Sequence, residues 1–152
     1  MNKQAGFTLV ELVVVIVILG LLAATALPKF INVTNQARTA SLEGVAGGLR
    51  SAAALAQSQY VLNGVNTATV VVMGGSNVTV LSESANAGRG GRPVATAAGI
   101  SAAMPNPDGF NAPTYAGNTA TYRPTTGGSA TCQVVYTANA TGDPVQVFKT
   151  TC

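Results

Sequence analysis

An apolar stretch at residues 7–27 constrains this chain more than any other feature. Its sequence, FTLVELVVVIVILGLLAATAL, is apolar apart from one carboxylate, Glu11, and two threonines. As a helix it would be roughly 30 Å long, at about 1.5 Å per residue, which matches the hydrocarbon core of a bilayer. The stretch therefore predicts a transmembrane helix. Glu11 is unusual within it, because a carboxylate in the hydrocarbon is costly and is kept for a function.

The composition leaves room for one further domain and disfavours several classes of function. Hydrophobic residues make up 47% of the 152 residues and charged residues only 9%, which suits a chain partly placed in lipid. The net charge of +3 is too small to indicate a nucleic-acid partner. There is no histidine, and the carboxylates are scattered, so no metal site or acid–base pair can be assigned: Glu11, Glu43, Glu83, Asp108 and Asp143. We predict a protein that is not an enzyme and has no cofactor.

A second helical pattern follows the apolar stretch. Apolar residues recur at spacings of three and four, which is typical of one face of an amphipathic helix: Leu42, Val45, Ala46, Leu49, Ala52, Ala53, Ala56 and Tyr60. The pattern predicts a helix over residues 28–63, continuous with the first, that ends at Asn63-Gly64 because glycine accepts the left-handed conformation. Pro28 is expected to kink or loosen this helix, since it lacks a backbone N–H.

Residues 64–152 predict a β-rich globular head. Short β-branched runs at residues 68–73 and 77–81, joined by Gly74-Gly75-Ser76, indicate a hairpin. Runs at residues 131–136 and 145–150 indicate two more strands around a turn at 139–144. Residues 82–124 are expected to form a long variable loop, with one helical turn at 99–104. The expected fold class is α+β, a long N-terminal helix packed on a small antiparallel sheet.

The head also contains a pair of cysteines and a pair of loop arginines. Cys132 and Cys152 are the only cysteines, and in an exported chain such a pair normally forms a disulfide, although two free thiols remain the alternative. Arg89 and Arg92 flank two glycines in the long loop. This short pattern is similar to a fragment of a nucleic-acid-binding segment, but two loop arginines are usually solvated, so no binding site is predicted there.

The residues before and within the apolar stretch resemble the leader and N-terminus of type IV prepilins, over Gly6-Phe7-Thr8-Leu9-Val10-Glu11. The resemblance implies that prepilin peptidase removes residues 1–6 on the cytoplasmic side, and that Phe7 becomes the N-methylated first residue. It also implies that Glu11 accepts the amine of a neighbouring subunit, and that Gly20 and Pro28 bracket a part of the helix that unwinds in filaments. The alternative is a plain signal anchor.

Finer details of the resemblance narrow the class. The six-residue leader and Phe7 are similar to type IVa pilins, and the run at residues 28–33 with the late cysteines is similar to mannose-sensitive haemagglutinin pilins. This implies a homo-oligomeric filament for adhesion and surface attachment. Its subunit would be stored in the inner membrane as a single-pass protein and extruded by the pilus assembly machinery. Two alternatives are a type II secretion pseudopilin and a membrane-anchored binding module that uses the loop at 82–124.

Overall fold

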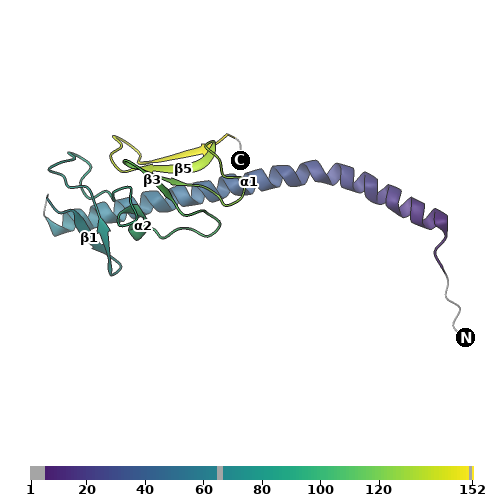
Figure 1. The fold of residues 1–152 in the computed structure, drawn as a ribbon, viewed down its shortest axis with the longest axis horizontal. Helices are drawn as coiled ribbons and strands as arrows, with labels where there is room; N and C mark the ends of the chain where they lie inside the picture. The colour runs from purple at the N-terminus through teal and green to yellow at the C-terminus, as the bar shows by residue number, and fades with distance from the viewer. Residues whose placement is uncertain (1–5, 65–66, 151) are drawn as a thin grey trace, which may run out of the picture. The chain divides into compact units, whose positions relative to one another are not determined.

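The computed structural model describes residues 6–64, 67–150 and 152, except for the side chains of residues 27–32. The chain divides into two compact units, Met1–Ala37 and Arg38–Cys152. One helix, α1 (Leu9–Asn63), contributes residues to both units (Figure 1). Residues 1–5 of the expected leader lie outside the described residues.

The first half of α1 is the predicted apolar helix. Its segment Leu9–Ala26 has a mean hydropathy of 2.8, and none of this segment is buried. Length and composition are those of a helix that can cross a membrane. Pro28 belongs to α1, which runs without interruption to Asn63. The expected loosening between Gly20 and Pro28 therefore stays a prediction about assembled filaments.

The second half of α1 buries one face, as the spacing of its apolar residues predicts. All eight residues of the predicted stripe are buried: Leu42, Val45, Ala46, Leu49, Ala52, Ala53, Ala56 and Tyr60. The helix ends at the expected position. Gly64 adopts a left-handed φ of 65°, and its N–H donates to the carbonyl of Val61 at 3.1 Å.

A four-stranded antiparallel sheet covers the first part of this buried face, in the spatial order β3 (Thr114–Ala116), β4 (Thr119–Tyr122), β5 (Cys132–Thr137) and β6 (Val145–Lys149). Side chains of β5 are alternately buried and half-buried, so Cys132, Val134 and Tyr136 point into the core. They pack in one cluster with Leu42 and Leu49 of α1. The helix supplies five of the fifteen buried residues of this cluster.

A separate hairpin covers the C-terminal end of the same face. It consists of β1 (Val70–Met73) and β2 (Ser76–Thr79), and its buried Val71 and Val78 form a second cluster with Ala56 and Tyr60. Figure 1 shows the hairpin and the sheet as separate layers along this half of α1. The stripe on α1 therefore carries two cores in succession.

Several boundaries differ from the sequence prediction. The hairpin turn contains only Gly74 and Gly75, at φ values of 55° and 84°, because two left-handed residues suffice to reverse the chain; Ser76 already belongs to β2. The expected loop at 82–124 is wrong near its end, where Thr114–Ala116 and Thr119–Tyr122 form β3 and β4. Within the same loop, α2 (Ile100–Ala103) coincides with the expected helical turn.

The C-terminal residue is tied to both the sheet and the helix. A disulfide joins Cys132, at the start of β5, to Cys152. The carbonyl of Cys152 also accepts a hydrogen bond from Arg38 Nη1 of α1 at 2.7 Å. The final segment is therefore held by one covalent bond and one charge-assisted bond.

Candidate functional site

The first turn of α1 is closed by a reciprocal pair of hydrogen bonds between Thr8 and Glu11. The backbone N–H of Thr8 donates to Glu11 Oε2 at 2.9 Å, and the backbone N–H of Glu11 donates to Thr8 Oγ1 at 3.3 Å. The hydroxyl of Thr8 donates to the same Oε2 at 2.8 Å. This is a capping box, in which a threonine before the helix and a glutamate three residues later satisfy N–H groups that the helix leaves unpaired.

The capping box changes the interpretation of Glu11. Its carboxylate is not isolated at the start of the apolar segment, because Oε2 is already engaged by Thr8. The sequence contained the signal for this pairing, since a Thr-x-x-Glu pattern before an apolar run is typical of a helix start. Sequence analysis had considered Glu11 only as a partner for an amine and missed Thr8.

The remaining hydroxyl of the apolar segment is also satisfied locally. Thr25 Oγ1 donates to the carbonyl of Leu22 at 3.0 Å, a bond within the helix. Such local bonds allow polar side chains to reside in lipid, where no water competes. Apart from Glu11 and Thr25, every side chain from Leu9 to Ala26 is apolar. The segment therefore presents an apolar surface along its whole length, with Glu11 as its single ionisable group.

The structure brings together only some of the residues predicted to form the site. Phe7 directly precedes the capping box, and its side chain is 89% exposed. Gly6 and Gly20 have no atoms within 4 Å of the position that a Cβ would occupy, so neither is required for packing within one subunit. The side chain of Pro28 lies outside the described part of α1. Phe7, Thr8 and Glu11 thus form the site, and Gly20 lies two to three turns further along the helix.

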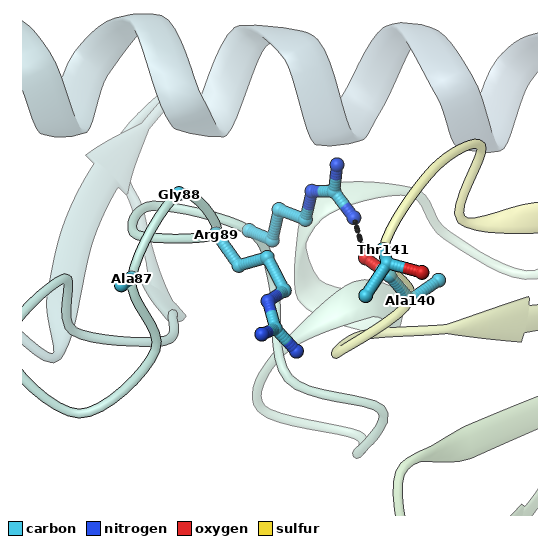
Figure 2. Close-up of a pocket in the computed structure, with 6 residues that line it drawn as sticks. Ala87, Gly88, Arg89, Ala140 and Thr141 are labelled. Atoms are coloured by element: carbon cyan, nitrogen blue, oxygen red, sulfur yellow. Dashed lines mark hydrogen bonds between the residues drawn. The ribbon is translucent and has the colours of Figure 1, made fainter.

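The two loop arginines are placed differently from expectation. Arg89 and Arg92 are half-buried, and both reach the turn between β5 and β6. Arg89 Nη1 donates to the carbonyl of Asn139 at 2.8 Å, and Arg92 Nη1 donates to that of Ala140 at 2.7 Å. Figure 2 shows Arg89 and Thr141 on opposite sides of a hollow between the loop and the turn. The sequence could not predict these two contacts, because Arg89 and Asn139 lie 50 residues apart, and Arg92 and Ala140 lie 48 residues apart.

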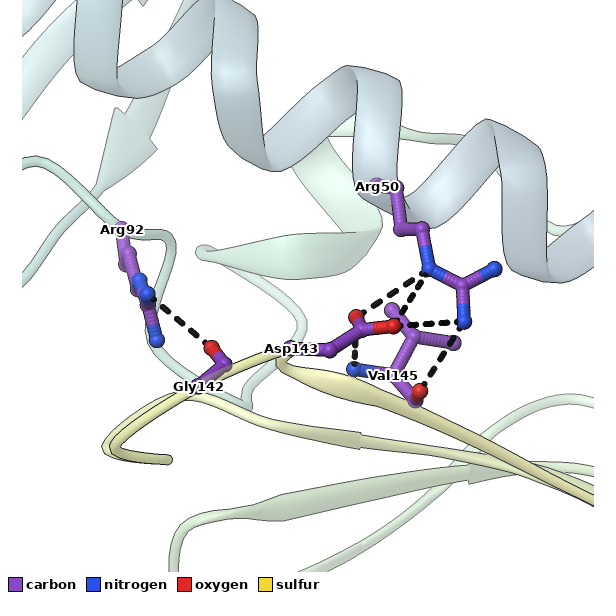
Figure 3. Close-up of polar contacts among 5 residues, drawn as sticks. All are labelled: Arg50, Arg92, Gly142, Asp143 and Val145. Atoms are coloured by element: carbon purple, nitrogen blue, oxygen red, sulfur yellow. Dashed lines mark hydrogen bonds and ion pairs between the residues drawn. The ribbon is translucent and has the colours of Figure 1, made fainter.

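A second polar cluster ties the same turn to α1 (Figure 3). Arg50 Nε donates to Asp143 Oδ2 at 2.8 Å, and Arg50 Nη2 donates to the carbonyl of Val145 at 3.1 Å. The hydrogen bond from Arg50 lowers the pKa of Asp143 below its usual value. Both side chains are about half exposed, at 42% and 51%, so the pair positions the turn more than it stabilises the fold.

These features define a class before any relative is considered. An exposed apolar helix with one carboxylate in its first turn precedes an α+β unit, and this is the arrangement of a subunit anchored by, or assembled through, its N-terminal helix. The family model of the prokaryotic N-terminal methylation motif matches residues 1–27.

Known proteins make the class more specific. The type IV narrow pilus major component PilA5 of Thermus thermophilus is 47% identical over 57 residues, which cover 38% of this chain and 49% of that protein. The type IV major pilin PilE1 of Neisseria gonorrhoeae is 43% identical over 60 residues, covering 40% and 34%. A fimbrial protein of Moraxella nonliquefaciens is 45% identical over 51 residues, covering 34% and 33%. No solved structure matches the chain.

Over its N-terminal part the chain is therefore similar to type IV pilins. The chain spans between a third and a half of the length of these relatives. The α+β fold, with a long apolar N-terminal helix and antiparallel sheets, is consistent with the pilin fold. The remaining part of the chain is therefore interpreted from its own structure.

Proposed function

We propose that this chain is a structural, non-enzymatic subunit of a type IV pilus, which polymerises into an extracellular filament for adhesion and surface attachment. The observation that carries the proposal is the apolar segment Leu9–Ala26, of which no residue is buried within the subunit. So large an apolar surface requires a partner, either lipid or other copies of the same segment. Two relatives that are similar over this part of the chain, PilA5 and PilE1, are major pilus subunits, which supports the proposal.

Processing would begin at the exposed N-terminal peptide. Gly6 is exposed and Phe7 is almost fully exposed, immediately before the helix starts at Leu9. A peptidase can reach a bond in such an extended segment, whereas it cannot reach one inside a helix. Cleavage between Gly6 and Phe7 would remove residues 1–6 and create a charged amine, which N-methylation would leave positive. In this proposal the subunit stays in the inner membrane through α1 until the assembly machinery extracts it.

Glu11 would select the register between subunits. The capping box occupies Oε2, and among the residues that the structure describes no partner of Oε1 is found. Oε1 is therefore the acceptor that an amine at Phe7 of an adjacent subunit could reach. In an apolar filament core an unpaired carboxylate is strongly disfavoured, and only one axial register relieves this. The pair would specify the register more than it adds net stability.

Mechanical shearing of cells tests the proposal and separates it from its nearest alternative. If the chain is a pilin, most of it should be recovered in the sheared fraction as filaments visible by electron microscopy. A type II secretion pseudopilin or a membrane-anchored binding module would stay with the membrane fraction. Recovery of the chain only with membranes, at natural expression levels, would overturn the proposal.

A further inference from the structure

A hollow beside Arg89 in the Arg38–Cys152 unit is lined by two arginines. It has a volume of about 250 Å³ and lies between the loop at 82–92 and the turn at 139–142 (Figure 2). Two guanidinium groups, one hydroxyl and two methyl groups line it, from Arg89, Arg92, Thr141, Ala87 and Ala140. Nothing in the proposed assembly of a pilus uses these residues.

The loop that carries the two arginines is fixed before any ligand arrives. The carboxylate of Glu83 accepts hydrogen bonds from the backbone N–H groups of Gly88 and Gly90, and these bonds lower its pKa. The backbone N–H of Glu83 in turn donates to the hydroxyl of Tyr60 at 2.8 Å. At Gly91 a Cβ would lie 2.5 Å from the Cβ of Tyr60, so the loop is packed directly against α1. A fixed loop loses little entropy on binding.

The arginines have donors to spare. A guanidinium carries five N–H groups. Within the described residues Arg89 uses only Nη1, toward Asn139, and Arg92 uses Nη1 and Nη2, toward Ala140 and Gly142. The two nearest carboxylates are already engaged, Glu83 by backbone N–H groups and Asp143 by Arg50. The three positive charges of Arg50, Arg89 and Arg92 thus exceed the two negative charges of Glu83 and Asp143 by one, and the guanidinium groups at the hollow keep unused donors.

We propose that this hollow binds an acidic saccharide, with the carboxylate of a uronic acid held by Arg89 and Arg92. Planar guanidinium groups match a carboxylate in a two-point geometry. Thr141 and the carbonyl oxygens of the turn can bond sugar hydroxyls, and the methyl groups of Ala87 and Ala140 can contact the ring face. Its volume lies below the roughly 300–1,000 Å³ of pockets for drug-sized ligands, which suits a single sugar ring.

A nucleic acid is the less favoured ligand for this site. Proteins that bind DNA through its phosphates typically neutralise about six to ten of them, with basic residues spread along a surface. Here two guanidinium groups line one open hollow, and the chain as a whole carries only +3. A single acidic group fits this arrangement better than a repeated backbone charge.

The test is a titration of the full chain, in an uncharged detergent without sugar groups, with trigalacturonate and with its methyl ester. Backbone amide signals of Gly88 and Thr141 should shift with the acid in a saturable manner, and the ester should not bind. Arg89→Gln should weaken binding by about tenfold or more, since it removes a charge-assisted contact. Arg123→Gln removes the same charge at a distant exposed position on β4 and should bind as the parent does.

Four results would overturn the proposal. The first is that trigalacturonate shows no binding at concentrations up to about 10 mM, which is the weak end of ligand affinity. The second is equal binding of the methyl ester, and the third is an equal loss of binding in Arg123→Gln. The fourth is that a DNA duplex shifts the same signals in preference to the saccharide. The comparison of acid with ester uses the unaltered chain, so it remains decisive even if Arg89→Gln perturbs the loop.

Discussion

Glu11 carries the only charge of the apolar segment, and its environment sets the first prediction. The variant Glu11→Val should still insert into the membrane and be cleaved after Gly6, because the anchor becomes no less apolar. Filament yield should collapse, because the carboxylate that we propose to select the register is gone. Immunoblots of sheared and membrane fractions measure both effects. Filaments at the parental level would show that Glu11 has another purpose.

Thr8 supplies a matched variant at the same site. Thr8→Val removes the hydroxyl of the capping box and keeps the size and charge of the segment. In the proposed assembly it should reduce filament yield less than Glu11→Val does, because Glu11 Oε1 would still be available to the amine of a neighbour. An equal loss of filament yield in both variants would show that assembly depends on the capping of the helix start and not on the carboxylate itself.

Asp143 provides a prediction that depends on pH. Its pKa is lowered chiefly by the hydrogen bond from Arg50, so its folded value lies below the unfolded value of about 3.9. Such a group stabilises the fold above the unfolded pKa, and this contribution disappears as the pH falls through the folded pKa. Asp143→Asn should lower the free energy of unfolding by about 0.5 kcal/mol at pH 7, given the exposure of the pair.

The measurement is urea unfolding of the full chain in uncharged detergent at several pH values. The difference between the parent and Asp143→Asn should close as the pH falls through the lowered pKa of Asp143 in the folded state, because the carboxyl group is then protonated in both states. Asp108→Asn is the control, because the structure describes no hydrogen bond or ion pair for that exposed carboxylate. A difference that persists unchanged at low pH would contradict the assigned role.

At the scale of elements, periodicity explains what the sequence could and could not predict. The stripe on α1 repeats at helical spacing over five turns, and every one of its residues is buried as predicted. Strands β3 and β4 have only three and four residues, all Thr, Ala or Tyr, and Gly117-Asn118 joins them. So short a run has no detectable alternation, and its pairing with β5 is a long-range contact. The two-residue turn at Gly117-Asn118 was the only local signal.

The stripe itself leads to a prediction with a control on the same helix. Leu49 is fully buried under the sheet, whereas Leu55 is 60% exposed one and a half turns later. Leu49→Ala should destabilise the Arg38–Cys152 unit by about 2–5 kcal/mol, through lost burial and the cavity left behind. Leu55→Ala should change the free energy of unfolding by about 0.5 kcal/mol or less. Equal effects in urea unfolding would contradict the assignment of the buried face.

At the scale of the whole molecule, the disulfide joins positions 20 residues apart and fixes the end of the chain to β5. In the chain-entropy model a loop of this size contributes roughly 3 kcal/mol. Cys152→Ser should therefore lower the midpoint of urea unfolding, and reductant should lower it equally in the parent. The native parent should resist a thiol reagent. Rapid labelling without unfolding would contradict a closed bond.

The intact mass of subunits sheared from cells tests the central claim most directly. That claim is that the N-terminal segment is processed for assembly and that its apolar helix packs with copies of itself in a filament. The predicted mass is that of a chain beginning at Phe7, with one added methyl group and the Cys132–Cys152 disulfide closed. A mass that retains residues 1–6 in assembled filaments would contradict the claim.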